Sequence, residues 1–184
     1  MSIYEDIKIK DAYGNHLVIQ ITNSINLKIE DQFDCVSLSA RYDHGFGFSQ
    51  LFRFVQDKQS KEIETICDQA NATSTPKFLP MNASKKWRVL VTPVIKSNDN
   101  KNTDIYRELM LSIIKEIQSI QGASILFSQY GLMLSNKIYQ FDGIIKALNE
   151  LKLVSFQKIH TIRFEIDSRY SNKVRDQFVK GLLN

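Results

Sequence analysis

The sequence contains few cysteines and no long hydrophobic run. Its two cysteines, Cys35 and Cys67, have no C-x-x-C spacing and no histidine near enough to complete a zinc set. Two free thiols in a reducing compartment are the simpler interpretation, and we expect neither a metal site nor a cofactor. No apolar run approaches the roughly 20 residues of a spanning helix, and Glu5 and Asp6 interrupt any signal-like start. We therefore expect a cytoplasmic protein without a membrane partner.

The sequence also lacks a concentrated block of one charge. Its 24 lysines and arginines exceed its 20 acidic residues by four, and the basic residues are spread along the chain. This mild excess suits an anionic ligand but does not favour nucleic acid. Hydrophobic residues make up 43% and charged residues 24%, as in ordinary globular proteins. With no repeat, low-complexity tract or linker, the 184 residues predict one domain spanning 1–184.

The periodicity of apolar residues predicts alternating strands and helices. A hairpin is expected first, since strands at 7–10 and 17–21 flank a Gly-containing turn. Further strands are expected at 33–40, 87–94, 124–127 and, half-exposed, 158–167. After the strand at 33–40, apolar residues from Phe48 onward recur at helical spacing and predict a helix. A second helical stretch covers 61–69. The segment 71–86, with Pro76 and Pro80, is interpreted as a connection.

Three more helices are expected in the second half of the chain. Thr103 or Asp104 is the predicted N-cap of the first, which Gly122 would end. The second carries Ile144 and Leu148, and Ser171 is the predicted N-cap of the last. This alternation favours a three-layer α/β/α domain with a mixed central sheet.

Several stretches occur in an order that resembles a divergent macro domain. D-C-V-S-L-S-A at 34–40 is similar to the family's strand D-a-I-V-N-A-A, and G-F-G-F at 45–48 occupies the place of its Gly-rich loop. T-P-K-F-L-P at 75–80 and the strand at 87–93 are similar to the family's approach to its next strand. F-S-Q-Y-G-L-M-L at 127–134 resembles the second phosphate loop. The resemblance covers nearly the whole chain and implies a macro-like α/β/α fold.

The resemblance implies a nucleotide site. Backbone N–H groups at Gly-containing turns and helix N-termini favour a diphosphate, Arg41 would pair with a phosphate, and Phe46, Phe48 and Tyr130 would stack on a ribose or base. The family's Asp after the second strand is absent, so Asn23 or Asn26 would accept the hydrogen bond of the adenine amino group. The expected ligand-binding residues are Asn23, Ser39, Arg41, Gly45, Phe46, Gly47, Phe48, Ser128, Gln129, Tyr130, Gly131 and Leu132.

The residues themselves leave other interpretations open. Phe48 is equally well explained as the first core residue of its helix, and Gly45 and Gly47 suit a turn with or without a ligand. Cys35 is interpreted as core packing rather than as a nucleophile.

Three functions follow. The first is a binding or sensing module for ADP-ribose or a related NAD-derived or cyclic nucleotide, which the resemblance places in bacterial signalling or antiviral defence. The second is an ADP-ribosyl hydrolase, whose weak catalytic candidates are Asp43 and His44. The third is a protein-interaction module that kept the fold and lost the ligand.

Overall fold

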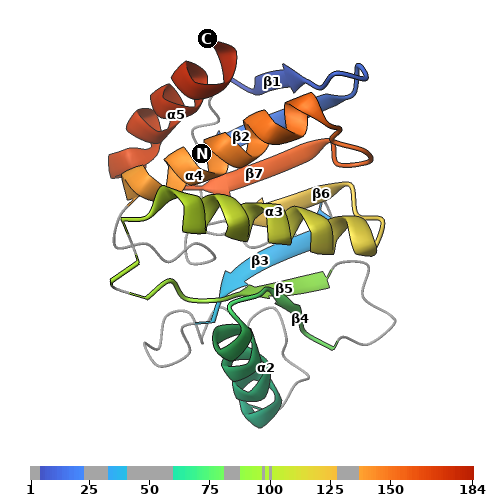
Figure 1. Ribbon diagram of the computed structural model, residues 1–184, viewed down its shortest axis with the longest axis vertical. Helices are drawn as coiled ribbons and strands as arrows, with labels where there is room; N and C mark the ends of the chain where they lie inside the picture. The colour runs from blue at the N-terminus through green and yellow to red at the C-terminus, as the bar shows by residue number, and fades with distance from the viewer. Residues whose placement is uncertain are drawn as a thin grey trace.

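A computed structural model describes residues 5–22, 33–40, 60–80, 88–96, 98–99, 101–127 and 137–184. Within these residues seven strands form one mixed sheet in the order β1-β2-β7-β6-β3-β5-β4, and four helices pack beside it (Figure 1). The strands are β1 (Ile7–Lys10), β2 (His16–Thr22), β3 (Cys35–Ser39), β4 (Lys77–Phe78), β5 (Arg88–Thr92), β6 (Ser124–Phe127) and β7 (Thr161–Glu165). The helices are α2 (Ser60–Thr73), α3 (Thr103–Ser119), α4 (Lys137–Leu153) and α5 (Ser168–Leu183).

The two faces of the sheet are covered by different helices, which gives three layers. Neighbouring strand residues point to opposite faces. One face, with Ile125 and Phe127, packs in the same core cluster as buried residues of α3, α4 and α5. The other face, with Leu126 and Val36, packs with α2. The predicted α/β/α arrangement around a mixed sheet is therefore confirmed.

Four phenylalanines make the centre of the larger core. The rings of Phe127 and Phe164, on neighbouring strands β6 and β7, stack with centroids 4.9 Å apart. Phe141 of α4 and Phe178 of α5 contact Phe164 at 6.0 and 5.3 Å between centroids. All four are almost completely buried, so this cluster fixes α4 and α5 on the sheet.

The first hairpin is held by the carboxylate of Asp11. It accepts hydrogen bonds from the backbone N–H groups of Tyr13 and Asn15 at 2.9 and 2.8 Å, and from that of Phe156 at 2.7 Å. It also accepts one from the Asn15 side chain at 2.9 Å. Burial alone would raise the pKa of Asp11, but these hydrogen bonds outweigh it and lower the pKa to about 2.

We expect Asp11→Asn to remove a stabilising contribution that depends on pH. The pKa of Asp11 in the folded protein lies below its ordinary value of 3.8. The ionised carboxylate therefore stabilises the fold fully above pH 3.8, and this contribution is lost as pH falls through about 2. Urea unfolding should therefore show a lower midpoint for the variant at pH 7 and a smaller difference near pH 2.5. Asp176→Asn, an exposed position on α5, is the matched control and should show neither effect.

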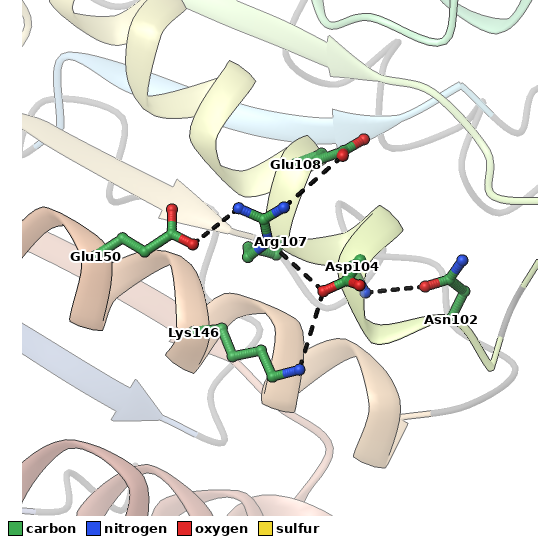
Figure 2. A network of polar contacts seen from close by, with 6 residues as sticks. All are labelled: Asn102, Asp104, Arg107, Glu108, Lys146 and Glu150. Carbon is green, nitrogen blue, oxygen red and sulfur yellow. Dashed lines mark hydrogen bonds and ion pairs between the residues drawn. The ribbon is translucent and has the colours of Figure 1, made fainter.

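Helices α3 and α4 are joined closely at Gly143. A Cβ atom at Gly143 would lie 2.5 Å from Tyr106 Cβ and 2.6 Å from the carbonyl oxygen of Thr103. Glycine is therefore required here because the two backbones nearly touch. Ion pairs cross the same contact on its exposed side: Arg107 reaches Glu150 at 2.8 Å, and Lys146 reaches Asp104 at 3.9 Å (Figure 2). Exposed pairs of this kind add little to stability, so backbone packing decides the contact.

Several details differ from the sequence-based predictions. The segment 71–86 is not wholly a connection, because α2 continues to Thr73 and Lys77–Phe78 forms β4, antiparallel to β5. Its two prolines flank this short strand. Each helix that was assigned an N-cap begins earlier than predicted: the cap of α3 is Asn102 rather than Thr103 or Asp104, and that of α5 is Asp167 rather than Ser171. In both cases a side chain just before the helix accepts an N–H of the first turn.

The end of α3 was also predicted one position late. The left-handed residue after α3 is Gln121, with φ of 54°, and not Gly122. Gly122 instead donates its N–H to the carbonyl of Ile117 at 2.9 Å, which completes a Schellman-type end. The predicted end of the helix was therefore close, but the residue with unusual backbone geometry was misassigned.

Candidate functional site

Five neighbouring strands of the sheet run parallel, so their carboxyl ends meet at one edge. These strands are β2, β7, β6, β3 and β5, and we call the edge where they end the carboxyl edge. Helices α3, α4 and α5 begin on this side, each following one of these strands in the chain (Figure 1). Ligands in open α/β sheets bind at such an edge, where helix N-termini favour anions. The strand ends are Thr22, Ser39, Thr92, Phe127 and Glu165.

Of the site residues expected from the sequence, Ser39 is within the described part of the chain. It ends β3, is buried, and pairs in register with Thr92 of β5. In the sequence, Asn23 directly follows the end of β2, and Ser128 directly follows the end of β6. The expected residues outside the described ranges are Asn23, Arg41, Asp43, His44, Gly45, Phe46, Gly47, Phe48, Ser128, Gln129, Tyr130, Gly131 and Leu132. For these residues the sequence-based assignments stay predictions.

The β3 end of the carboxyl edge is held by hydrogen bonds from β5 and α2. The hydroxyl of Thr92 donates to the carbonyl of Leu38 at 3.1 Å, and the N–H of Ala40 donates to the carbonyl of Thr92 at 2.8 Å. The side chain of Asn71 donates to the Ala40 carbonyl at 3.3 Å and accepts from the Val94 N–H at 2.9 Å. Asn71 therefore ties the end of α2 to the chain just after β3 and β5.

A buried carboxylate lies at the carboxyl edge where β7 ends. Glu165 is 2% exposed and pairs in register with Thr22, the last residue of β2. No described residue hydrogen-bonds either of its carboxylate oxygens. Burial raises the pKa of Glu165 to about 7, although the positive charge of Arg163 partly opposes this. The group can therefore change its charge near neutral pH.

The nearby Arg163 guanidinium does not satisfy this carboxylate. Its Nε donates to the side-chain oxygen of Gln20 at 2.9 Å, and its guanidinium carbon lies 5.0 Å from the ring centroid of Phe33. Burial lowers the pKa of Arg163, while the charge of Glu165 raises it. Arg163 and Glu165 lie two positions apart on the same face of β7. Each influences the pKa of the other by charge, but Arg163 donates no hydrogen bond to either carboxylate oxygen of Glu165. Glu165 is left with unused hydrogen-bonding capacity.

A second buried polar side chain belongs to the first turn of α4. Gln140 is 1% exposed, and none of the described residues hydrogen-bonds its amide oxygen or nitrogen. Because α4 follows β6, this first turn lies on the carboxyl-edge side of the sheet. Buried polar groups normally have partners, so Gln140 and Glu165 both call for an explanation.

Sequence reasoning missed Glu165 because it placed this position on the exposed side of its strand. The alternation at 158–167 predicted a half-exposed strand, and Thr161 and Arg163 are half-buried as expected, but Glu165 at the end of β7 is buried. Arg163 and Glu165 occupy the alternate positions that would face water in an edge strand. The signal that was available is the β-α alternation, which favours a parallel and therefore buried strand.

The two cysteines offer no nucleophile. Both are free and buried, and burial raises the pKa of Cys35 and of Cys67 to about 12. The thiolate form is therefore strongly disfavoured, as expected for inert core cysteines. Across the described ranges, histidine, cysteine and acidic side chains do not gather in threes as a metal site would need.

The architecture matches solved macrodomains. No protein-family model and no curated protein matches the sequence. The Oceanobacillus iheyensis macrodomain with ADP is similar with a TM-score of 0.61 and 10% identity, over 100% of this chain and 98% of that one. A variant of it with ADPR is similar with a TM-score of 0.58 and 12% identity, over 97% of this chain and 99% of that one. The Trypanosoma brucei macrodomain is similar with a TM-score of 0.61 and 14% identity, over 88% of this chain and 66% of that one.

These similarities define the class of the fold. The chain has the macrodomain fold, at sequence identities so low that they show the fold alone. The resemblance predicted from the sequence is therefore confirmed as a divergent macro domain in architecture. In the described part of the chain, no helix is both long and apolar enough to cross a membrane.

Proposed function

We propose that this protein binds ADP-ribose, or a related NAD-derived or cyclic nucleotide, at the carboxyl edge and acts as a binding or sensing module. The observation that carries the proposal is the structural match over nearly the full length of both chains to macrodomain structures with ADP and ADPR. Two features of the described residues support it. The helices after β5, β6 and β7 begin at this edge, and two buried polar side chains, Gln140 and Glu165, have unused hydrogen-bonding capacity there.

The other functions expected from the sequence gain no comparable support. The hydrolase depends on Asp43 and His44, which lie outside the described residues. The interaction module would dock through Phe178, Leu182 and Leu183 near the end of α5. Of these, Phe178 and Leu182 are buried in the core, and Leu183 alone is exposed. We therefore propose binding alone.

Addition of ADP-ribose should raise the melting temperature of the protein. A ligand that binds only the folded state, present at 100 times its dissociation constant, stabilises by about 2.7 kcal/mol. For a domain of this size that corresponds to a rise of roughly 5–10 °C. Thermal denaturation with and without 1 mM ADP-ribose measures the shift.

Inorganic diphosphate at the same concentration is the control, because it reports non-specific anion effects on a basic protein. The proposal requires a larger shift with ADP-ribose than with diphosphate. If ADP-ribose and cyclic nucleotides at millimolar concentration leave the melting temperature unchanged, the proposed function is wrong.

A further inference from the structure

The least explained group in the described residues is the carboxylate of Glu165. It is 2% exposed, and no described residue donates a hydrogen bond to it. Elsewhere in the fold, a buried carboxylate is fully used: Asp11 accepts four hydrogen bonds. A buried acid without partners costs stability, and it is retained most readily where a ligand supplies the missing donor.

The position of Glu165 indicates which kind of ligand group reaches it. It is the last residue of β7 and pairs with the last residue of β2, so it lies at the carboxyl edge. A carboxylate repels phosphate, whereas amino and hydroxyl groups donate to it. Arg163, the charged group among the described residues that acts on Glu165, is engaged with Gln20 and Phe33. Among the described residues, the hydrogen-bonding capacity of the Glu165 carboxylate is therefore left unused.

We infer that Glu165 is a specificity-determining contact of the bound nucleotide, and that its carboxylate accepts a hydrogen bond from an amino or hydroxyl group of the nucleoside. This inference rests on the proposed function, because it assigns a contact within the same site.

The assignment has a measurable consequence for pH. The pKa of Glu165 in the free protein is raised to about 7, and a donor group binds the ionised form. The ligand therefore binds the fraction of protein in which Glu165 is charged, and this fraction rises with pH. The apparent affinity should increase about tenfold from pH 6 to pH 8. A diphosphate diester does not titrate in this range, so the ligand itself adds no such slope.

Titration calorimetry of the whole chain with ADP-ribose at pH 6, 7 and 8 tests the inference. The wild type should bind more tightly as pH rises and release protons at pH 6 to 7, which is detected by comparing buffers of different ionisation enthalpy. Glu165→Gln should bind about tenfold more weakly than the wild type at pH 8, with no pH dependence and no proton release. Glu64→Gln, an exposed acid on α2, should bind like the wild type.

A second ligand separates the two sources of the donor. The analogue whose base carries hydrogen in place of the amino group should lose the pH dependence if the amino group is the donor. It should keep the dependence if a ribose hydroxyl is the donor. Either result supports the contact with Glu165.

The outcomes that overturn the inference differ from those that overturn the proposed function. A wild type that binds ADP-ribose with the same affinity from pH 6 to pH 8, or a Glu165→Gln variant with wild-type affinity and proton release, overturns the inference alone. A wild type that binds at no pH overturns the proposed function, and the inference with it.

Discussion

Replacing Glu165 by glutamine should stabilise the ligand-free protein at pH 8 by about 3 kcal/mol and leave its stability at pH 5 nearly unchanged. The folded pKa of Glu165 is raised from 4.5 to about 7, so the folded state holds a proton that the unfolded state has lost. Stability therefore falls as pH rises from about 4.5 to about 7 and then levels off. A difference of this size corresponds to about 3 kcal/mol, and glutamine removes it because it has no charge to bury.

Urea unfolding of the wild type and Glu165→Gln from pH 5 to pH 8 measures this difference. The curves of free energy of unfolding against pH should diverge across that range, with the variant above. Glu64→Gln should follow the wild type, since its side chain is exposed. Parallel curves for wild type and Glu165→Gln would show that the carboxylate is not buried in the free protein.

This expected gain bears on function. A substitution that stabilises the fold while weakening the ligand is typical of a residue kept for binding rather than for folding. The same Glu165→Gln protein therefore separates the two roles, because weaker binding by a more stable variant cannot result from unfolding.

Replacing Gly143 by alanine should destabilise the protein by about 2 kcal/mol or more. The added Cβ would meet Tyr106 Cβ at 2.5 Å, the Thr103 carbonyl oxygen at 2.6 Å and the Arg107 nitrogen at 2.8 Å. Two of these atoms are backbone of α3, so the clash is relieved only by moving α3 away from α4. Overpacking costs about 1–3 kcal/mol and occasionally more, and a clash with backbone atoms lies at or above the upper end of this range. After the gain of about 1 kcal/mol that alanine brings over glycine inside a helix, a net loss of about 2 kcal/mol or more remains.

Gly181→Ala is the matched control, because it also adds a methyl group to a helical glycine. Its Cβ would meet Ile145 Cγ2 at 2.6 Å, but this atom belongs to a side chain, so a local shift of Ile145 relieves the contact without moving a helix backbone. We expect its free energy of unfolding to stay within about 1 kcal/mol of the wild type. Equal effects of the two substitutions in urea unfolding would show that the α3–α4 contact is not limited by backbone approach.

The elements best predicted from the sequence are those whose burial pattern is local. β6 was predicted at 124–127 and is observed at those residues, and the first hairpin has the predicted strands. The helix ends were predicted less well. Asn102 and Asp167, rather than the residues chosen, cap α3 and α5, because several neighbouring polar residues suit a cap equally and tertiary position selects one.

For the candidate site, the resemblance predicted which segments would hold the ligand but not the buried carboxylate of Glu165. The resemblance directed attention to the segments after β3 and β6, which lie outside the described residues apart from Ser39. Glu165 escaped notice because the meaning of a charged residue in an alternating strand depends on what covers that face, and this is not a local property.

The sequence by itself determined the α/β class and the order of strands and helices, because apolar periodicity and turn residues act over a few positions. The macro-like architecture followed from the resemblance of its motifs to that family. Only the tertiary structure decided that β7 lies between β2 and β6, that Gly143 brings two helix backbones together, and that the Glu165 carboxylate is buried without a hydrogen-bond partner among the described residues. These features depend on contacts between residues far apart in the chain, which no local pattern encodes.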